Sequence, residues 1–118
     1  MPANSQDSKN YLQFLSLLKT VHDLQGFADL ETHEEQLLNT LGTVWRTDKQ
    51  ITVLQAMGIL TDLSGTTVHR LLKRLRKKGF IKLLTDEIDG RIKYVMPTDI
   101  AFQHFAQIGQ CMKEAMAN

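Results

Sequence analysis

The chain has 118 residues, 42% of them hydrophobic, which suits one domain with a modest core. Its 14 basic and 13 acidic residues leave a net charge of +1, so the total charge alone argues against a polyanion partner. The sequence has no apolar run near 18 residues, no pattern of a signal peptide and only one cysteine, so we expect a cytoplasmic protein with no membrane partner and no disulfide.

The charge is unevenly distributed along the chain. Residues 64–93 contain three acidic residues and nine basic ones, namely Arg70, Lys73, Arg74, Arg76, Lys77, Lys78, Lys82, Arg91 and Lys93. The remainder contains five basic and ten acidic residues. A phosphate backbone responds to charge within a Debye length of roughly 8–10 Å, so a local basic segment is sufficient to attract it.

Two helices are predicted in the first half of the chain. The first covers about residues 7–24 and ends at Gly26, because apolar side chains recur there at helical spacing: Tyr11, Phe14, Leu15, Leu18 and Val21. The second starts at Thr32 and ends near Trp45, and the spacing of Thr32 and Glu35 predicts a capping box.

A third, short helix is predicted to begin at Thr52, where Thr52 and Gln55 repeat the capping-box spacing. Ser64 is the clearest helix start in the chain, and this fourth helix should end at Gly79.

Two strands follow, over residues 80–85 and 91–96, with Ile92, Tyr94 and Met96 on one face of the second. The connecting "DEIDG" ends in Asp-Gly, a common hairpin turn pair. Thr98 should cap a last helix whose apolar stripe is Ala101, Phe105, Ile108, Met112 and Ala115.

The order of these elements predicts a mainly α protein with a small β-hairpin wing (α+β), a winged helix-turn-helix with one extra helix at each end. We expect a single domain over residues 1–118, in which residues 32–97 form the winged-helix core.

The fourth helix is predicted to have one apolar side and one basic side. Helical spacing places Val68, Leu71, Leu72 and Leu75 within one arc that faces the core. The opposite side contains no acidic residue, so its cations repel one another at i,i+3 and i,i+4, at about 0.2–0.5 kcal/mol for each pair. A polyanion would offset this repulsion. The alternative is a solvated face whose last lysines complement the helix dipole.

A helix about 10–12 Å across fits the B-DNA major groove, which makes double-stranded DNA the predicted partner. RNA is the weaker candidate, because its A-form major groove is too narrow for a helix. The first residues of such a helix read bases, while Arg74, Lys77 and Lys78 suit phosphate contacts. The predicted DNA-binding residues are Ser64, Thr66, Thr67, His69, Arg70, Lys73, Arg74, Lys77, Arg91 and Lys93.

The stretch "LSGTTVHRLLKRLRKKGFIKLL" followed by "DEIDGR" resembles the MarR-type winged-helix transcription regulators, over residues 32 to about 98. Asp86, Asp89 and Arg91 match the Asp-x-x-Asp-x-Arg pattern of that family's wing. The resemblance implies a homodimer on a two-fold DNA site, with Arg91 in the minor groove and Asp89 and Gly90 supporting it. The alternatives are a plain hairpin turn at Asp89-Gly90, a solvated Arg91, and a more general winged-helix regulator.

The predicted function is therefore that of a sequence-specific DNA-binding transcription regulator, and the alternative is a winged-helix protein-interaction or assembly module. Helices 7–25 and 98–117 are expected to dimerise, although they could also cover the core as ordinary helices. Nothing in the sequence supports an enzyme, a metal site or a cofactor, and a small-molecule effector stays open. Cys111 is expected to be a buried thiol.

Overall fold

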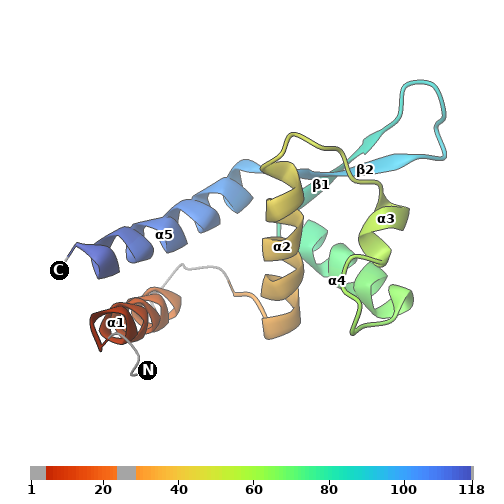
Figure 1. Ribbon diagram of the computed structural model, residues 1–118. Helices are drawn as coiled ribbons and strands as arrows, with labels where there is room; N and C mark the ends of the chain where they lie inside the picture. The colour runs from red at the N-terminus through yellow and green to blue at the C-terminus, as the bar shows by residue number, and fades with distance from the viewer. Residues whose placement is uncertain (1–4, 24–28, 118) are drawn as a thin grey trace. The chain divides into compact units, whose positions relative to one another are not determined.

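The computed structural model describes residues 5–23 and 29–117 (Figure 1). The elements, in chain order, are α1 (Ser5–His22), α2 (Thr32–Trp45), α3 (Val53–Met57), α4 (Gly65–Lys77), β1 (Ile81–Thr85), β2 (Lys93–Pro97) and α5 (Asp99–Met116). The predicted fold class is confirmed: the protein is mainly helical, with one antiparallel hairpin. Helix α1 begins two residues before the predicted start, and its predicted end at Gly26 lies outside the described residues. None of the described helices combines the length and the apolar character that crossing a bilayer requires.

The chain forms two compact units. The first unit, Leu30–Phe102, contains α2, α3, α4 and the hairpin, and we call it the winged unit. The second unit consists of α1 and the part of α5 after residue 102, and we call it the terminal unit.

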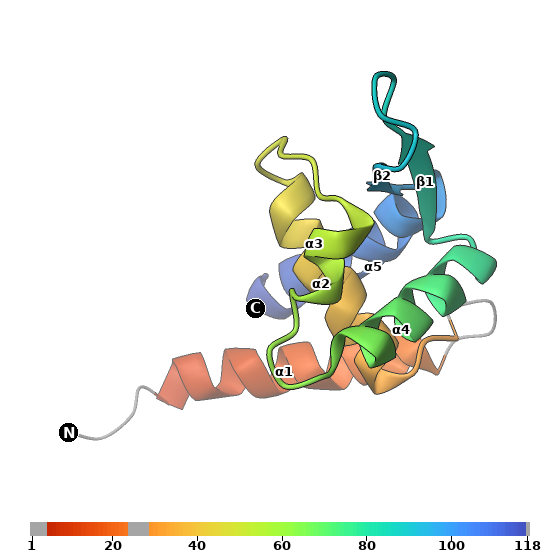
Figure 2. The same ribbon diagram turned by 90° about the vertical axis from the view of Figure 1, so that its right-hand side faces the viewer.

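The core of the winged unit lies where α2 and α4 meet the base of the hairpin (Figure 2). Leucines from α2 and aliphatic residues from α4 fill it, together with Phe80, Ile81 and Val95. The four residues predicted to anchor α4 are all buried, with exposed fractions of 0% for Val68, 4% for Leu71, 5% for Leu72 and 0% for Leu75. The prediction of the apolar side of α4 is therefore confirmed.

The buried face of β2 is the one opposite to the face that Ile92, Tyr94 and Met96 share in the sequence pattern. Val95 is fully buried, whereas Ile92 lies before the strand and is 37% exposed. The backbone of Val95 explains this: its N–H donates to the Ile51 carbonyl at 2.8 Å, and its carbonyl accepts from the Trp45 indole at 3.0 Å. These contacts turn the Val95 side chain toward the core.

Three of the four predicted N-caps are confirmed. The Ser64 hydroxyl accepts from the Thr67 N–H at 3.1 Å, the Thr52–Gln55 capping box is present, and the Thr98 hydroxyl accepts from the Ala101 N–H at 3.3 Å. The fourth prediction, a Thr32–Glu35 box, is wrong by one residue. The N-cap of α2 is Glu31, and the Glu34 carboxylate accepts from its backbone N–H at 3.0 Å.

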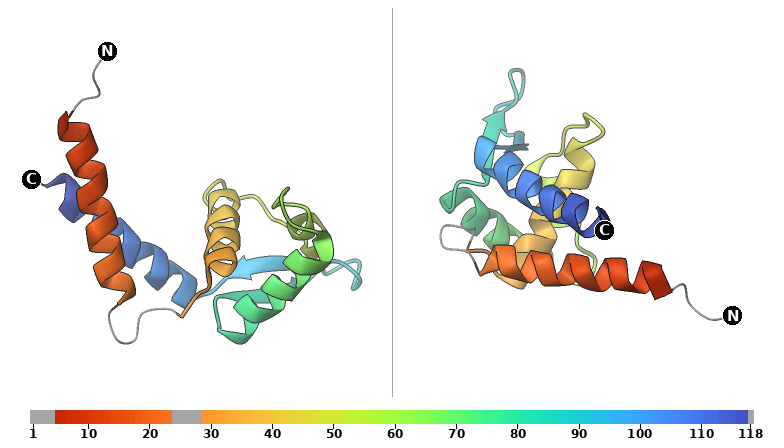
Figure 3. Two further views of the ribbon diagram at one scale, coloured as in Figure 1. Left: turned by 90° about the horizontal axis from the view of Figure 1, so that it is seen from below. Right: turned by 90° about the vertical axis from the view of Figure 1, so that its left-hand side faces the viewer.

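In the terminal unit, α1 and α5 are single uninterrupted helices that lie side by side (Figure 3). The buried stripe of α5 consists of Ala101, His104, Cys111 and Ala115, so it is rotated from the predicted one, and Met112 is 49% exposed. The expectation of a buried Cys111 is confirmed, and its thiol contacts the Leu17 carbonyl at 3.8 Å. Burial raises the pKa of this thiol, which keeps it protonated.

Candidate nucleic-acid interface

Local interactions stabilise both ends of helix α4. At its start the Ser64 and Thr67 hydroxyls also hydrogen-bond to each other at 2.9 Å. At its end Gly79 takes a positive φ of 88°, which a residue with a side chain rarely adopts, and the chain turns there into β1. The helix is thereby fixed with its aliphatic side inward and its basic side outward.

The predicted DNA-binding residues of α4 all lie on or beside its outer face. Thr67 and His69 are half-buried, and the others are exposed: Ser64, Thr66, Arg70, Lys73, Arg74 and Lys77. Among the residues that the structure describes, no acidic side chain reaches ion-pairing distance of Arg70, Lys73 or Lys77. These cations therefore remain available to a ligand.

Two other basic side chains of this segment are paired within the protein. Arg74 approaches Glu31 at 3.3 Å, and since both side chains are largely exposed this pair contributes at most about 1 kcal/mol. Lys78 donates to the Glu34 carboxylate at 2.8 Å, and that carboxylate is fully buried. The Lys78 ammonium thus neutralises Glu34 within the protein, and its contact with phosphate stays a prediction.

Glu34 stays ionised in this position. Burial acts to raise its pKa, but the hydrogen bonds from Lys78 and from the Glu31 N–H, with the charges of Lys78 and Arg74, outweigh it and hold the pKa below the ordinary 4.5. In the sequence, this glutamate has only the signal of a helix start. Its link to Lys78 joins residues 44 positions apart, which no local pattern reveals.

The wing carries Arg91 in a defined position. The Arg91 guanidinium donates to both carboxylate oxygens of Asp89, from Nε at 3.1 Å and from a terminal nitrogen at 3.0 Å, and its backbone N–H donates to the same carboxylate. These bonds lower the pKa of Asp89 and raise that of Arg91. The Arg91 side chain is nevertheless 91% exposed, so it is oriented but open to a ligand.

Asp86 organises the rest of the wing tip. One of its carboxylate oxygens accepts from the N–H groups of Ile88 and Asp89, at 3.0 and 2.9 Å, and the other accepts from the Tyr94 hydroxyl at 2.8 Å. The two backbone bonds and the tyrosine lower the pKa of Asp86, and the same contact raises the pKa of Tyr94. The sequence pattern singled out Asp86 but not its partner Tyr94.

The tip is not the tight Asp-Gly turn that the sequence suggested. The Ile92 N–H donates to the Asp89 carbonyl at 3.0 Å, so the central pair of the turn is Gly90-Arg91. Neither Gly90 nor Arg91 has a positive φ. A Cβ atom added to Gly90 would have no other atom within 4 Å. The Asp86 and Asp89 carboxylates, rather than glycine, determine the conformation of this loop.

An open groove of about 550 Å³ separates the wing from the helices of the winged unit. Its polar lining consists of Thr52, Gln55, His69, Arg91 and Lys93, while Val53 and Leu83 contribute to an apolar floor. No acidic residue lines it. Lys93, predicted at the interface, thus lies in this groove, together with His69 from α4. Elsewhere in the described part of the chain, no three metal-ligating side chains gather.

The sequence matches no protein-family model and no curated protein. Solved structures, however, have the same fold. The heme sensor protein PefR from Streptococcus agalactiae, in complex with heme, is 24% identical with a TM-score of 0.59, over 93% of this chain and 69% of PefR. A MepR mutant from S. aureus is 18% identical with a TM-score of 0.61, over 93% and 70%.

The transcriptional regulator Tm0710 from Thermotoga maritima is 13% identical with a TM-score of 0.61, over 89% of this chain and 66% of Tm0710. These structural neighbours are MarR-type regulators, so the predicted resemblance is confirmed at the level of the fold. With its capped helix α4 and its hairpin wing, the chain has the winged-helix fold of the MarR-type transcription regulators.

Proposed function

We propose that the protein is a sequence-specific, double-stranded DNA-binding transcription regulator of the cytoplasm. Helix α4 enters the major groove, where Thr66, Thr67 and Arg70 meet base edges, and Lys73 and Lys77 meet the backbone. Arg91, oriented by Asp89, reaches the adjacent minor groove. The observation that carries this proposal is the outer face of α4, where Arg70 and Lys73 are exposed without an acidic partner in the described residues.

A homodimer completes the proposal. Helices α1 and α5 carry exposed apolar side chains, among them Leu12 at 62% and Met112 at 49%. A two-fold dimer through these helices would present two α4 helices to successive major grooves, roughly 34 Å apart. That the structural neighbours are transcription regulators supports this function.

The test is binding to duplexes selected from a random pool, measured by fluorescence anisotropy across a salt series. A dimer that neutralises about six to eight phosphates gives a log–log slope of about −5 to −7. Arg70→Ala should cost about 1–3 kcal/mol on the selected site and relax its sequence preference, whereas Lys77→Ala should weaken all duplexes alike. Lys113→Ala on α5 is the matched control and should change neither quantity.

A protein-interaction module is the second candidate, and the wing tip is the observation that favours it. Ile88 is 97% exposed there, between the acidic Glu87 and Asp89. If the protein is such a module, its affinity for duplex DNA should not depend on the salt concentration. A partner protein should co-purify with the wild-type protein but not with Ile88→Ser. A steep salt slope with unchanged binding by Ile88→Ser would favour the DNA regulator.

A further inference from the structure

Two carboxylates at the start of α2 pair with two cations near the end of α4, and the two pairs differ in burial. Glu34 is fully buried and holds the Lys78 ammonium at 2.8 Å. Glu31 instead meets Arg74 at the surface, where a terminal guanidinium nitrogen donates to one carboxylate oxygen at 3.3 Å. In this second pair, 48% of the Arg74 side chain and 70% of the Glu31 side chain are exposed.

The difference in burial determines which pair can open. The Glu34–Lys78 pair stays closed, because its opening would leave a carboxylate away from water without a partner. The Glu31–Arg74 pair can open, since water solvates both groups once they separate, and an exposed pair of this kind changes an equilibrium by at most about fivefold. Its single bond of 3.3 Å is also longer than the roughly 2.7–2.9 Å of strong charge-assisted hydrogen bonds. Arg74 is therefore held, but only loosely.

Arg74 lies among like charges on α4. Arg70 precedes it by four residues and Lys77 follows it by three, and neither has an acidic side chain at ion-pairing distance among the described residues. Like charges at these spacings repel one another, so an unpaired Arg74 is unfavourable in the protein without DNA. Glu31 relieves part of this repulsion. A backbone phosphate could relieve it equally well, and a guanidinium can bind a phosphate through two parallel hydrogen bonds.

We propose that Glu31 takes the place of a DNA phosphate in the free protein, and that Arg74 exchanges Glu31 for a backbone phosphate when a duplex binds. Glu31 thereby lowers the affinity for DNA, because its contact with Arg74 must open before the guanidinium can reach the phosphate. A phosphate contact carries no sequence information, so selected and unrelated duplexes are affected alike. The inference rests on the proposed function and assigns a role in DNA binding to an acidic residue that no sequence pattern singled out.

Glu31→Gln tests the competition, because it removes the charge and keeps the size of the side chain. The bond between the backbone N–H of residue 31 and the Glu34 carboxylate does not involve the substituted side chain, so the start of α2 should be retained. We expect the affinity to rise about two- to fivefold per subunit in anisotropy titrations, with the thermal midpoint of unfolding unchanged. Glu114→Gln removes the same charge from an exposed position of α5 and should change the affinity little.

Arg74→Ala separates the exchange from a general effect of charge. In the wild-type protein this substitution removes both the phosphate contact and the pair with Glu31, so part of the loss is offset. In the Glu31→Gln background the loss should be larger, by the same factor that Glu31→Gln gains. Correspondingly, Glu31→Gln should leave the affinity nearly unchanged in a protein that already carries Arg74→Ala.

The failure of this inference differs from the failure of the proposed function. If the wild-type protein binds duplexes with a steep salt slope and Glu31→Gln binds them no more tightly, the exchange is overturned and the proposed function stands. If Glu31→Gln gains equally with and without Arg74, the glutamate acts through its charge alone, and the exchange is again overturned. If the wild-type protein binds no duplex even at low salt, the proposed function and the inference that rests on it are both wrong.

Discussion

Glu34 is a carboxylate with no exposed surface, and its charge is balanced by Lys78 at the end of α4. Removing one partner of a buried pair leaves the other charge uncompensated, which is far more costly than losing a surface pair. The pair also links the first turn of α2 to the C-terminal end of the recognition helix. A single residue thus couples the stability of the winged unit to the placement of helix α4.

We predict that Lys78→Met destabilises the protein by about 2–4 kcal/mol, the lower end reflecting the partial exposure of the lysine. Urea unfolding followed by circular dichroism measures this. Lys77→Met is the matched control, since Lys77 is exposed and makes no ion pair with a described residue, and it should change stability by less than about 0.5 kcal/mol. Equal effects of the two substitutions would contradict a structural role for the pair.

The Glu34–Lys78 pair also makes the stability of the protein depend on pH. The pKa of Glu34 is lower in the folded protein than its ordinary 4.5, so its contribution to stability is fully present above that pH. The contribution is lost as the pH falls below 4.5 and through the folded-state value, because the unfolded chain then binds the proton more readily. Glu34→Gln should therefore unfold with a weaker acid dependence than the wild-type protein over that range.

At the scale of single elements, the wing shows how side chains can shape a loop. Asp86 and Asp89 together accept five hydrogen bonds from backbone and side-chain donors within the loop and one from β2, donated by the Tyr94 hydroxyl. The tyrosine is the connection between the tip and the strand. Arg91 can therefore be presented to DNA in one arrangement before binding, which reduces the entropy lost when the complex forms.

We predict that Tyr94→Phe lowers DNA affinity because it frees the wing tip from β2. The affinity loss should vanish in an Arg91→Ala background, where the wing contact is already absent. Anisotropy titrations of the four proteins in this cycle measure it. An affinity loss that persists without Arg91 would show that Tyr94 does not act through the wing.

The elements that were predicted correctly are those with local signals. Ser64, the aliphatic spacing of α4 and Gly79 define the recognition helix within one short segment, and the structure agrees with each. The buried face of β2 could not be predicted, because both of its faces carry apolar residues and the choice between them is made by Ile51 and Trp45 from elsewhere in the chain.

The candidate site likewise contains some features that the sequence predicts and others that it does not. The outward cations of α4 and the Asp89–Arg91 pair could be read from helical periodicity and from a short motif. The Lys78–Glu34 pair and the position of Thr52 and Gln55 in the lining of the groove could not. Sequence marks Thr52 and Gln55 as a capping box, and only the fold reveals that the box faces a basic groove.

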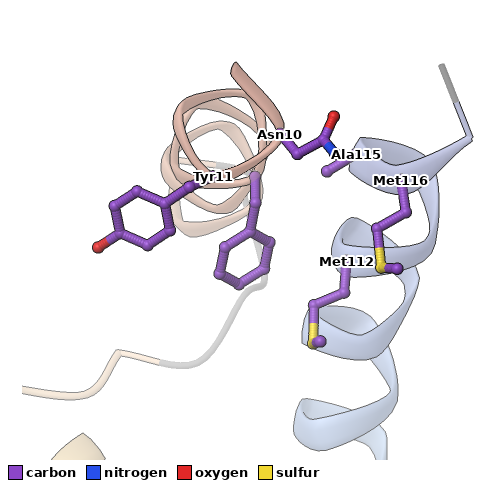
Figure 4. Close-up of a pocket in the computed structure, with 6 residues that line it drawn as sticks. Asn10, Tyr11, Met112, Ala115 and Met116 are labelled. Carbon is purple, nitrogen blue, oxygen red and sulfur yellow. The ribbon is translucent and has the colours of Figure 1, made fainter. Parts of the chain in front are cut away.

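At the scale of the whole molecule, the terminal unit leaves much apolar surface uncovered. None of the described side chains of α1 is fully buried, and Tyr11 and Leu12 are more than 60% exposed. Between α1 and α5 lies an open apolar hollow of about 240 Å³, beside which Met112 and Met116 project from α5 (Figure 4). Apolar helix faces of this kind are stable in water when a second copy covers them, and a small chain gains most from such burial.

We predict that Met112→Lys weakens the dimer, because it places a charge in an interface that must exclude water. Light scattering at micromolar concentration should detect a shift toward the monomer. A monomer makes half the phosphate contacts, so the log–log salt slope of DNA binding should fall from about −5 to −7 to about half that value. The mass shift and the reduced slope should appear together, since both follow from the loss of one subunit.

Gln107→Lys provides the control, because it adds the same charge to an exposed position of α5 without removing an apolar side chain. It should leave both the mass and the slope unchanged. A wild-type protein that stays monomeric while it binds a selected site with the full slope would overturn the dimer. The winged unit would then supply all the phosphate contacts from one copy, and the apolar faces of α1 and α5 would need a different partner.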